Sequence, residues 1–231
     1  MGRPGVRRHK TFEGIYWVVR EGEKRLATLS QDPGTTVYGE DTVRIADKEY
    51  RVWDPYRSKL AAAVLKGLSN VPIKVGSSVL YLGAASGTTA SHVSDIVKEK
   101  GRVYCVEFAQ RSFRDLVNNA IKNRRNMTPI FGDARSPEKY RSIVQGVDTV
   151  YADIAQPDQA RILSENIEQY LSDNGEFLFA VKARSIDVSK DPSTIFRREG
   201  TLLEEKGYKV KEMIRLDPFE RDHCMILGSK R

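Results

Sequence analysis

The chain has 231 residues, of which 40% are hydrophobic and 30% are charged, with 17 glycines and 9 prolines. This length and composition exclude collagen-like, low-complexity and wholly disordered chains, and they suit one ordinary domain with a small extension. The longest apolar run, at residues 60–65, is far too short to cross a membrane. The formal net charge of +7 favours an anionic partner, of which nucleic acid is the commonest.

Cysteine usage predicts a reducing compartment. The two cysteines, Cys105 and Cys224, both lie in apolar stretches, and they form neither a disulfide framework nor a Cys-x-x-Cys metal pair. No group of Cys, His and Asp has the spacing of a metal site, so we expect no metal. The basic first ten residues precede no hydrophobic stretch, so we expect no secretory signal and a cytoplasmic protein.

Residues 1–55 have the pattern of a small antiparallel sheet. Short β-prone segments are separated by glycine and proline, and Asp47-Lys48 suits a tight turn. The predicted strands are 14–20, 25–29, 43–46 and 49–53. An isolated sheet of this size is marginally stable, so we expect it to pack on the segment that follows, with Tyr16, Trp17 and Trp53 in the core. Asp54-Pro55 marks the boundary, which gives predicted domains of residues 1–55 and 56–231.

Beyond this boundary, helical and strand-like segments alternate. The expected helices are 58–68, 89–98, 112–123, 136–144, 158–171 and 193–206. The expected strands are 78–82, 102–107, 127–131, 147–152, 175–181, 209–216 and 223–228. These strands are nearly continuous apolar runs, and alternating βα units predict a parallel, doubly wound sheet of the α/β class. Only a short turn separates the last two strands, so we expect them to form an antiparallel pair at the sheet edge.

A loop of small residues follows the first strand of this sheet, at the end where such sheets bind ligands. The segment runs from Gly83 and Ala84 through Gly87 to Thr89, and it lets a ligand approach the backbone. It lacks the third glycine of a dinucleotide fingerprint, so a tight strand–helix turn is the alternative. Glu107 lies 24 residues beyond Gly83, where an acid that binds ribose hydroxyls is expected; the alternative is a surface glutamate. Together these residues favour a nucleoside-containing cofactor.

Three later strands also end in polar side chains. Asp133 is a candidate acceptor for the exocyclic amine of adenine, or alternatively a turn residue. Asp153 follows a buried strand, and the neighbouring Asp158 suits the N-cap role better. Lys182 emerges directly from an apolar strand, which is costly unless an opposite charge pairs with it. We expect that partner to be Asp153, either within a functional site or as a structural ion pair.

Six segments of the chain resemble the fibrillarin family. They are YRSKLAAAVLKG, VLYLGAASGTTASHVSDIV, VYCVEFAQRSFRDLV, PIFGDAR, YADIAQPDQARIL and PFERDHCMI. The combination of GAASGTT, VEF, GDAR and DIAQ is highly specific, and nearly the whole length matches. Because no Gly/Arg-rich extension like that of the eukaryotic nucleolar forms is present, we expect the archaeal type.

The resemblance implies an RNA 2′-O-ribose methyltransferase of box C/D guide-RNA particles, which uses S-adenosylmethionine and acts on rRNA and tRNA. It implies a Rossmann-like methyltransferase sheet, mostly parallel with the last strand antiparallel, beside a small N-terminal β domain. The cofactor-binding residues expected from the glycine-rich loop and the resemblance are Gly83, Ala84, Thr88, Thr89, Glu107, Phe108, Asp133, Ala134, Asp153, Ile154, Ala155 and Gln156. The implied Lys-Asp-Lys-His catalytic set is Lys59, Asp153, Lys182 and His223. From the residues alone, Lys59 reads as a solvated helix lysine and His223 as a structural histidine.

The family's partners are a box C/D guide RNA, the target rRNA or tRNA, a Nop-domain scaffold protein and a kink-turn-binding protein that resembles a ribosomal protein. No membrane partner is expected. RNA is expected to follow a basic surface, although solvated tails and helices are the alternative. The candidate residues are Arg3, Arg7, Arg8, Lys10, Arg111, Arg114, Arg124, Arg125, Arg184, Lys190, Arg197 and Arg198. No base-reading signature is present, so we expect a guide strand to select the target.

The hypothesised reaction transfers the sulfonium methyl group in line to a ribose 2′-hydroxyl. Lys182 is the candidate base or oxyanion-stabilising cation, Asp153 orients the lysines, and Lys59 supplies a positive neighbour. Two alternatives stay open. One is a methyltransferase that acts on a protein side chain. The other is a non-enzymatic assembly factor that binds the cofactor only for stability, against which the complete Lys-Asp-Lys-His set argues.

Overall fold

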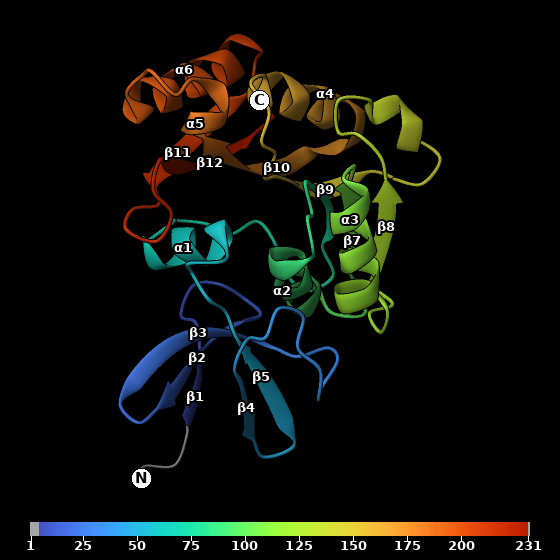
Figure 1. Cartoon of the computed structure of the whole chain (residues 1–231), viewed down its shortest axis with the longest axis vertical. Coiled ribbons are helices and arrows are strands. Elements are labelled where there is room, and N and C mark those ends of the chain that lie inside the picture. Colours follow the sequence, from blue (N-terminus) through green and yellow to red (C-terminus); the bar gives the residue numbers. More distant parts are fainter. Residues whose placement is uncertain (1–4, 231) are drawn as a thin grey trace.

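The computed structural model describes residues 5–230, which form two β-sheets (Figure 1). The first is antiparallel, with five strands in the order β1-β2-β3-β5-β4. The strands are β1 (Gly5–Arg8), β2 (Ile15–Arg20), β3 (Glu23–Leu29), β4 (Thr42–Ile45) and β5 (Lys48–Val52). Four of them were expected. The sequence GVRR of β1 has no apolar alternation, and it becomes a strand only by pairing with β2.

The second sheet has seven strands in the order β11-β12-β10-β9-β6-β7-β8. Its strands are β6 (Ser78–Leu82), β7 (Arg102–Glu107), β8 (Met127–Phe131), β9 (Val147–Ala152), β10 (Leu171–Lys182), β11 (Lys209–Arg215) and β12 (His223–Ser229). Five neighbouring strands are parallel to one another, in the order β10-β9-β6-β7-β8. Strand β12 runs antiparallel to both β10 and β11. The predicted doubly wound sheet with an antiparallel pair at its edge is therefore confirmed.

The helical elements connect these strands. They are α1 (Lys59–Leu65), α2 (Thr88–Val97), α3 (Gln110–Asp115), the π-helix η1 (Leu116–Ile121), the 3₁₀ turn η2 (Pro137–Tyr140), α4 (Gln159–Tyr170), α5 (Ala183–Ile186) and α6 (Pro192–Glu205). Two predictions were wrong in detail. The helix expected at 112–123 widens into a π-helix from Leu116, and the one expected at 136–144 is only a single turn that starts at Pro137.

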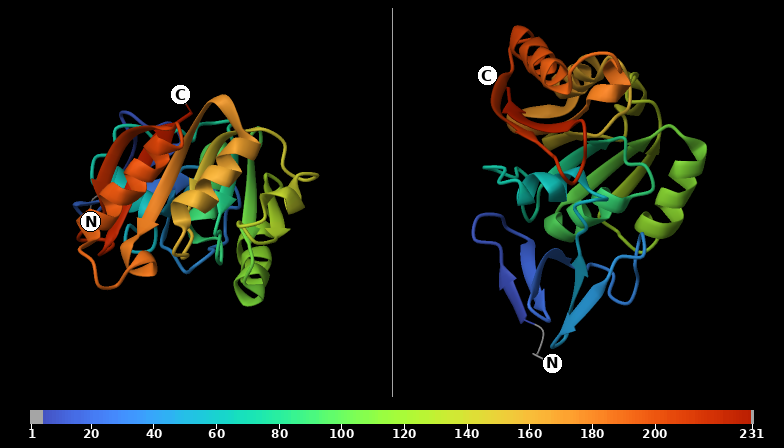
Figure 2. Two further views of the ribbon diagram at one scale, coloured as in Figure 1. Left: turned by 90° about the horizontal axis from the view of Figure 1, so that it is seen from above. Right: turned by 60° about the vertical axis from the view of Figure 1, so that its left-hand side comes forward.

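The large sheet is covered by helices on both faces, as the two views of Figure 2 show. Along β6, Val79 and Tyr81 pack with α1, α2 and η1, whereas Leu80 and Leu82 pack with α4 and α6. Because successive strand residues point to opposite faces, a continuous apolar run fills both layers. Trp53 is fully buried in the first of these cores, and Tyr16 and Trp17 are partly buried.

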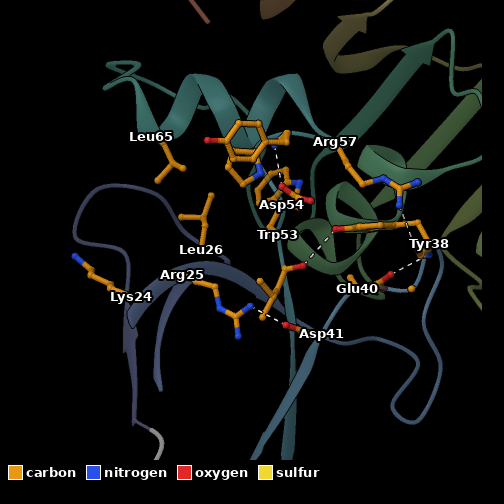
Figure 3. A pocket seen from close by; sticks show the side chains of 14 residues that line it. Lys24, Arg25, Leu26, Tyr38, Glu40, Asp41, Trp53, Asp54, Arg57 and Leu65 are labelled. Atoms are coloured by element: carbon orange, nitrogen blue, oxygen red, sulfur yellow. Dashed lines mark hydrogen bonds and ion pairs between the residues drawn. The ribbon is translucent and has the colours of Figure 1, made fainter. Parts of the chain in front are cut away.

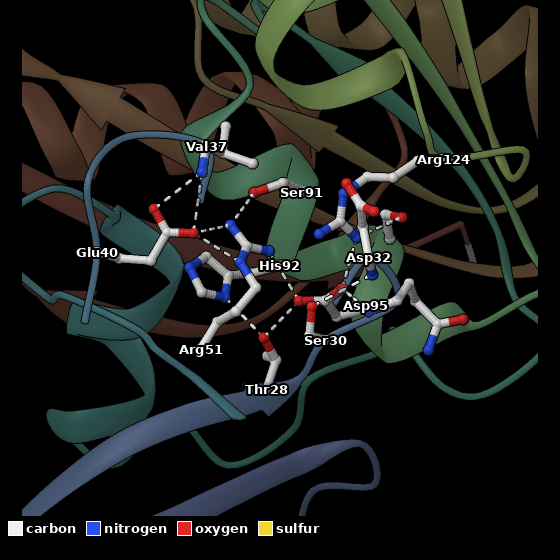
Figure 4. Close-up of polar contacts among 12 residues, drawn as sticks. Thr28, Ser30, Asp32, Val37, Glu40, Arg51, Ser91, His92, Asp95 and Arg124 are labelled. Atoms are coloured by element: carbon white, nitrogen blue, oxygen red, sulfur yellow. Dashed lines mark hydrogen bonds and ion pairs between the residues drawn. The ribbon is translucent and has the colours of Figure 1, made fainter. Parts of the chain in front are cut away.

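A buried charge cluster joins the N-terminal sheet to α2 (Figure 4). Arg51 of β5 lies 2.6 Å from Glu40 and 2.8 Å from Asp95, and Arg124 lies 2.5 Å from Asp95. All four side chains are almost completely buried. The placement of Arg124 on an RNA-binding surface is therefore wrong, because its guanidinium is needed to neutralise a buried carboxylate.

His92 lies in the same cluster. The Thr28 hydroxyl donates to Asp95 at 2.8 Å, so the Thr28 oxygen accepts from Nδ1 of His92 at 2.7 Å. The hydroxyl of Tyr38 lies 2.8 Å from Nε2 and 3.2 Å from the carbonyl oxygen of Val52. Burial, together with the nearby guanidinium groups of Arg51 and Arg124, holds the pKa of His92 well below its usual value. This histidine is therefore neutral and links α2 to the small sheet.

Candidate functional site

The carboxyl ends of the parallel strands surround a cavity of about 210 Å³. Its walls come from the loops after β6, β7, β8 and β9 and from the last residue of β10. The lining residues are Gly83, Ala85, Val106, Glu107, Phe108, Gly132, Asp133, Ala134, Arg135, Asp153, Ile154, Ala155, Gln156, Ile162 and Lys182. Four loops and one strand end that are far apart in the sequence thus build one concave site at the edge of the sheet where ligands of this fold class bind.

The glycine-rich loop after β6 is shaped by close packing. Gly83 has φ +79°, and a Cβ there would lie 2.4 Å from the backbone oxygen of Asp153, so no larger residue fits. Gly87 has φ +92°, and a Cβ there would lie 2.5 Å from the Cβ of Ala120 in η1. These glycines bring the backbone of the loop against β9 and η1, and that places Ala85 on the cavity wall.

Glu107 ends β7 and is buried, with 7% of its surface exposed. Its Oε2 accepts from the backbone N–H of Ala85 at 2.9 Å, and its Oε1 accepts from the N–H of Ala109 at 2.8 Å. Each carboxylate oxygen still has a lone pair free, because two backbone donors occupy only half of the acceptor sites. Glu107 is therefore a rigid, pre-oriented acceptor on the cavity wall, as expected for a group that binds vicinal hydroxyls.

Asp133 also lines the cavity, and its carboxylate is already engaged. Arg135 Nη2 lies 2.6 Å from its Oδ2, and the N–H of Arg135 donates to Oδ1 at 2.9 Å. The side-chain hydrogen bond from Arg135 holds the pKa of Asp133 below its usual value. Phe108, 57% exposed, and the largely buried Ala134 offer apolar surface beside it. A flat, partly apolar ligand fits this part of the cavity better than a highly charged one.

Two lysines converge on Asp153 at one side of the cavity. Lys59 Nζ lies 3.2 Å from Oδ2 of Asp153, and Lys182 Nζ lies 2.9 Å from Oδ1. Burial alone would raise the pKa of Asp153, but the two ammonium groups outweigh it and lower the pKa. Each oxygen of the Asp153 carboxylate is therefore engaged by one ammonium group at the edge of the cavity.

Local structure fixes both lysines. Lys59 opens α1 directly after the N-cap Ser58, whose oxygen accepts from the N–H of Ala61 at 3.3 Å and from the hydroxyl of Thr89 at 3.0 Å. The backbone of Lys182 is clamped by Gln159, which accepts from its N–H at 3.0 Å and donates to its carbonyl at 3.1 Å. The two ammonium groups therefore approach Asp153 from secondary structure on either side of it.

His223 lies beside Lys182, because β12 pairs with β10 so that these two residues are opposite each other. Its Nδ1 lies 2.6 Å from the carbonyl oxygen of Arg221, and since a carbonyl only accepts, Nδ1 carries the proton. Burial lowers the pKa of His223, and Lys59 lowers it further. The imidazole is therefore neutral near pH 7, with Nε2 as an available acceptor.

Some of the predicted site residues line the cavity, and others lie outside its wall. Those on the cavity wall are Gly83, Glu107, Phe108, Asp133, Ala134, Asp153, Ile154, Ala155, Gln156 and Lys182. Those behind or beside it are Lys59, Ala84, Thr88, Thr89 and His223. Thr89 is turned toward Ser58 and holds α1. The wall residues that sequence reasoning missed are Ala85, Val106, Gly132, Arg135 and Ile162. Four of them adjoin predicted residues at the strand ends, whereas Ile162 comes from α4 and carries no local signal.

The remaining predicted RNA-contacting residues are exposed in the described structure, apart from Arg3, which lies outside the described residues. Arg184 is paired with Asp222 at 2.9 Å, and Lys190 with Asp187 at 3.5 Å. Exposed pairs of this kind contribute little to stability. Their side chains can therefore be redirected to another anion at small cost.

A second hollow, of about 500 Å³, lies between the N-terminal sheet and α1 (Figure 3). Leu26 of β3 and Leu65 of α1 face each other across it, and Arg25 on its wall is paired with Asp41 at 2.7 Å. No predicted site residue lines it. No three His, Cys, Asp or Glu side chains among residues 5–230 gather as metal ligands. Within the same range, no helix is long and apolar enough to span a membrane.

Comparison with known proteins gives matches over the full length of the chain. The model of the fibrillarin family matches residues 6–231. A fibrillarin-like rRNA/tRNA 2′-O-methyltransferase from Aeropyrum pernix is 52% identical over 98% of this chain and 97% of its own length. A fibrillarin-like rRNA/tRNA 2′-O-methyltransferase from Methanopyrus kandleri is 51% identical over 95% of both chains.

Solved structures give the same result. A crystal structure of A. pernix fibrillarin with natively bound S-adenosyl-L-methionine has a TM-score of 0.91 and 52% identity, and it covers 99% of this chain and 100% of that one. The structure of a fibrillarin–Nop5p complex has a TM-score of 0.84 and 38% identity, with 96% and 100% coverage. The likeness therefore includes both sheets and the candidate site.

Proposed function

The chain belongs to the fibrillarin family, and from that premise we propose that it is an RNA 2′-O-ribose methyltransferase that uses S-adenosylmethionine and acts on rRNA and tRNA. Its relatives are named for this activity, and the A. pernix fibrillarin binds this cofactor. The observation that carries the proposal is the convergence of Lys59 and Lys182 on Asp153 beside the strand-end cavity. A buried acid with two cationic partners in a cleft is typical of a functional site.

The cavity residues fit S-adenosylmethionine. Glu107 offers two oxygens with free lone pairs for the ribose hydroxyls, and Phe108, Ala134 and Ile154 offer apolar surface for a base. When bound, the cofactor supplies a methyl group that is already activated by attachment to a positively charged sulfur.

The chain's own residues would then orient and activate the ribose hydroxyl. Two ammonium groups against one carboxylate leave a net positive charge, which stabilises an oxyanion that develops on the 2′-oxygen. Lys182 takes up the hydroxyl proton as it passes one of its own protons on, so the proton count of its amino group is unchanged. Asp153 holds both lysines in place, so that this oxygen is presented in line with the methyl group.

His223 completes the arrangement as the nearest neutral acceptor. Because its Nδ1–H is committed to the carbonyl of Arg221, Nε2 is free to accept a proton passed from the lysine cluster. Its lowered pKa keeps the imidazole in this form near neutral pH. We therefore assign it a role in proton transfer and no role in binding the cofactor.

A Nop-domain scaffold protein is the partner best supported, because a 38% identical fibrillarin forms a complex with Nop5p. We also propose a box C/D guide RNA and a kink-turn-binding protein as further partners, and a cytoplasmic location. The absence of a base-reading signature in the sequence supports the guide RNA.

The test is methyl transfer from tritiated S-adenosylmethionine to a target RNA, with guide RNA and scaffold protein present. Asp153→Asn and Lys182→Met are expected to lose about 100-fold or more in turnover. Lys211→Met, which removes an exposed lysine paired with Glu176, is the matched control and should stay near wild type. Circular dichroism and a thermal melt show that each variant is folded. Near-normal turnover of Asp153→Asn would contradict the assignment, and label in protein instead of RNA would favour a protein substrate.

A further inference from the structure

A hollow of about 380 Å³ on the outer side of the β1 edge is lined by cations and one indole ring. Its charged walls are Arg7 and Arg8 of β1, Lys10, and Lys24 of β3, and no acidic residue lines it. Within residues 5–230, none of these four side chains forms an ion pair, whereas the neighbouring Arg25 is paired with Asp41. These four unpaired cations, of which Arg8 points to the opposite face of β1 from Arg7, create a positive local field around the β1 edge.

The floor of this hollow is a stack of aromatic rings. The imidazole of His9 lies 4.7 Å from the ring of Phe12 and 5.6 Å from that of Trp17, with interplanar angles of 11° and 27°. The ammonium of Lys24 stands 3.9 Å from the centroid of the Trp17 ring. The ammonium group of a flexible lysine is easily displaced from an aromatic ring. The face of Trp17 that Lys24 covers can therefore accept another planar or cationic group.

The stack is held rigidly. The backbone N–H groups of Thr11 and Phe12 both donate to Nδ1 of His9 at 3.2 Å, which leaves the proton of the neutral ring on Nε2. Gly14 has φ +75°, and a Cβ there would lie 2.9 Å from Cγ2 of Ile96, so this segment packs directly on α2. The hollow is therefore preformed and bears a further donor at the His9 Nε2.

We propose that this surface, defined by Arg7, Arg8, His9, Lys10, Trp17 and Lys24, binds a single-stranded segment of RNA at a distance from the catalytic cluster. Cations without partners hold phosphates, and an aromatic face stacks bases of any identity. Such contacts carry no sequence choice, in agreement with the absence of a base-reading signature. This proposal rests on the proposed function in one respect, namely that RNA is the macromolecule that the protein binds.

The geometry of α2 fixes how far the surface lies from the cavity. The segment that carries the stack packs at the C-terminal end of α2, whereas the N-terminal end follows the glycine-rich loop. This helix has 10 residues and is therefore about 15 Å long. The surface and the cavity are therefore separate sites at opposite ends of this helix.

The test is fluorescence anisotropy of a labelled RNA of about 12 nucleotides, without guide motifs, titrated with the full chain over a range of salt concentrations. The variant Arg7→Gln/Lys10→Gln removes two exposed cations of the surface. The matched control, Arg44→Gln/Lys48→Gln, removes two exposed cations from the β4–β5 hairpin at the other edge of the same sheet. Both variants lose the same net charge and keep the core intact.

The surface variant is expected to bind RNA about 10-fold more weakly, with a slope of log Kd against log salt reduced by about 1.4, because each lost phosphate contact on a single strand removes about 0.7. The control should change less than about 2-fold. Equal losses in the two variants, or an unchanged slope, would overturn the proposal. Unchanged RNA affinity with lost binding to the Nop-domain scaffold would identify a protein interface instead and would also overturn it. Methyl transfer, measured separately, reports on the proposed function and not on this surface.

Discussion

Replacement of Asp95 by Asn is expected to destabilise the protein by about 3–5 kcal/mol, the cost of removing one partner from a buried ion pair. Asn keeps the volume and one acceptor oxygen of the side chain, so the change is almost purely electrostatic. Asp95 pairs with Arg51 at 2.8 Å and with Arg124 at 2.5 Å, and it also accepts from the hydroxyl of Thr28. Without it, Arg51 retains Glu40, but Arg124 has no other carboxylate within ion-pair distance in the described residues.

The measurement is urea unfolding followed by circular dichroism, with a thermal melt as a second readout. For a chain of this size, each kcal/mol corresponds to about 2–4 °C, so the melting temperature should fall by roughly 6–20 °C. Asp158→Asn is the control, because Asp158 forms only an exposed pair with Arg161, and it should cost less than about 1 kcal/mol. A loss below about 1 kcal/mol for Asp95→Asn would refute the claim that this cluster stabilises the contact between the N-terminal sheet and α2.

Two further predictions concern protonation and cofactor binding. Because the pKa of His92 is lowered in the folded protein, the unfolded chain binds more protons below pH 6.5, and the free energy of unfolding should fall with decreasing pH by at most about 1.4 kcal/mol per unit for this group. Denaturant unfolding between pH 8 and 5 should therefore show a smaller slope in His92→Asn, and equal slopes would contradict the neutral, buried assignment. Glu107→Gln should weaken S-adenosylmethionine binding by about 10- to 100-fold in calorimetry, because an amide presents a donor where the carboxylate accepts from Ala85 or Ala109. Wild-type affinity in this variant would exclude Glu107 from the cofactor site.

Four of the seven strands of the large sheet could be read from the sequence to the residue, whereas β10 begins four residues before its predicted start and β11 and β12 each differ by one residue at the end. The predicted bounds 78–82, 102–107, 127–131 and 147–152 are those of β6 to β9. A strand buried on both faces must be apolar at every position, and glycine or polar residues end it abruptly, so both signals are local. Since ligands bind at the carboxyl ends of such strands, the sequence also predicts Glu107, Asp153 and Lys182 as residues of the binding site.

Helix and edge boundaries were less predictable. The π-helix η1 places Ala120 against Gly87. The pattern of apolar residues in the segment 112–123 does not indicate this contact. The strand β1 depends on pairing with β2, because its own sequence is too short and too charged to favour an extended conformation. In each case a neighbour that is distant in the sequence supplies the stabilising contact.

The sequence by itself determined the fold class, the order of the strands along the chain and the side chains that follow each strand, because burial and turn formation depend on local residue types. The pairing of Lys182 with Asp153 was also predicted, but only the tertiary structure decided the other buried charge pairs. Lys59 reads as a solvated helix lysine but reaches Asp153, and Arg124 reads as a surface cation but neutralises the buried Asp95. Electrostatic pairing depends on distances between side chains far apart in the sequence, and those distances exist only once the sheet and its covering helices have packed.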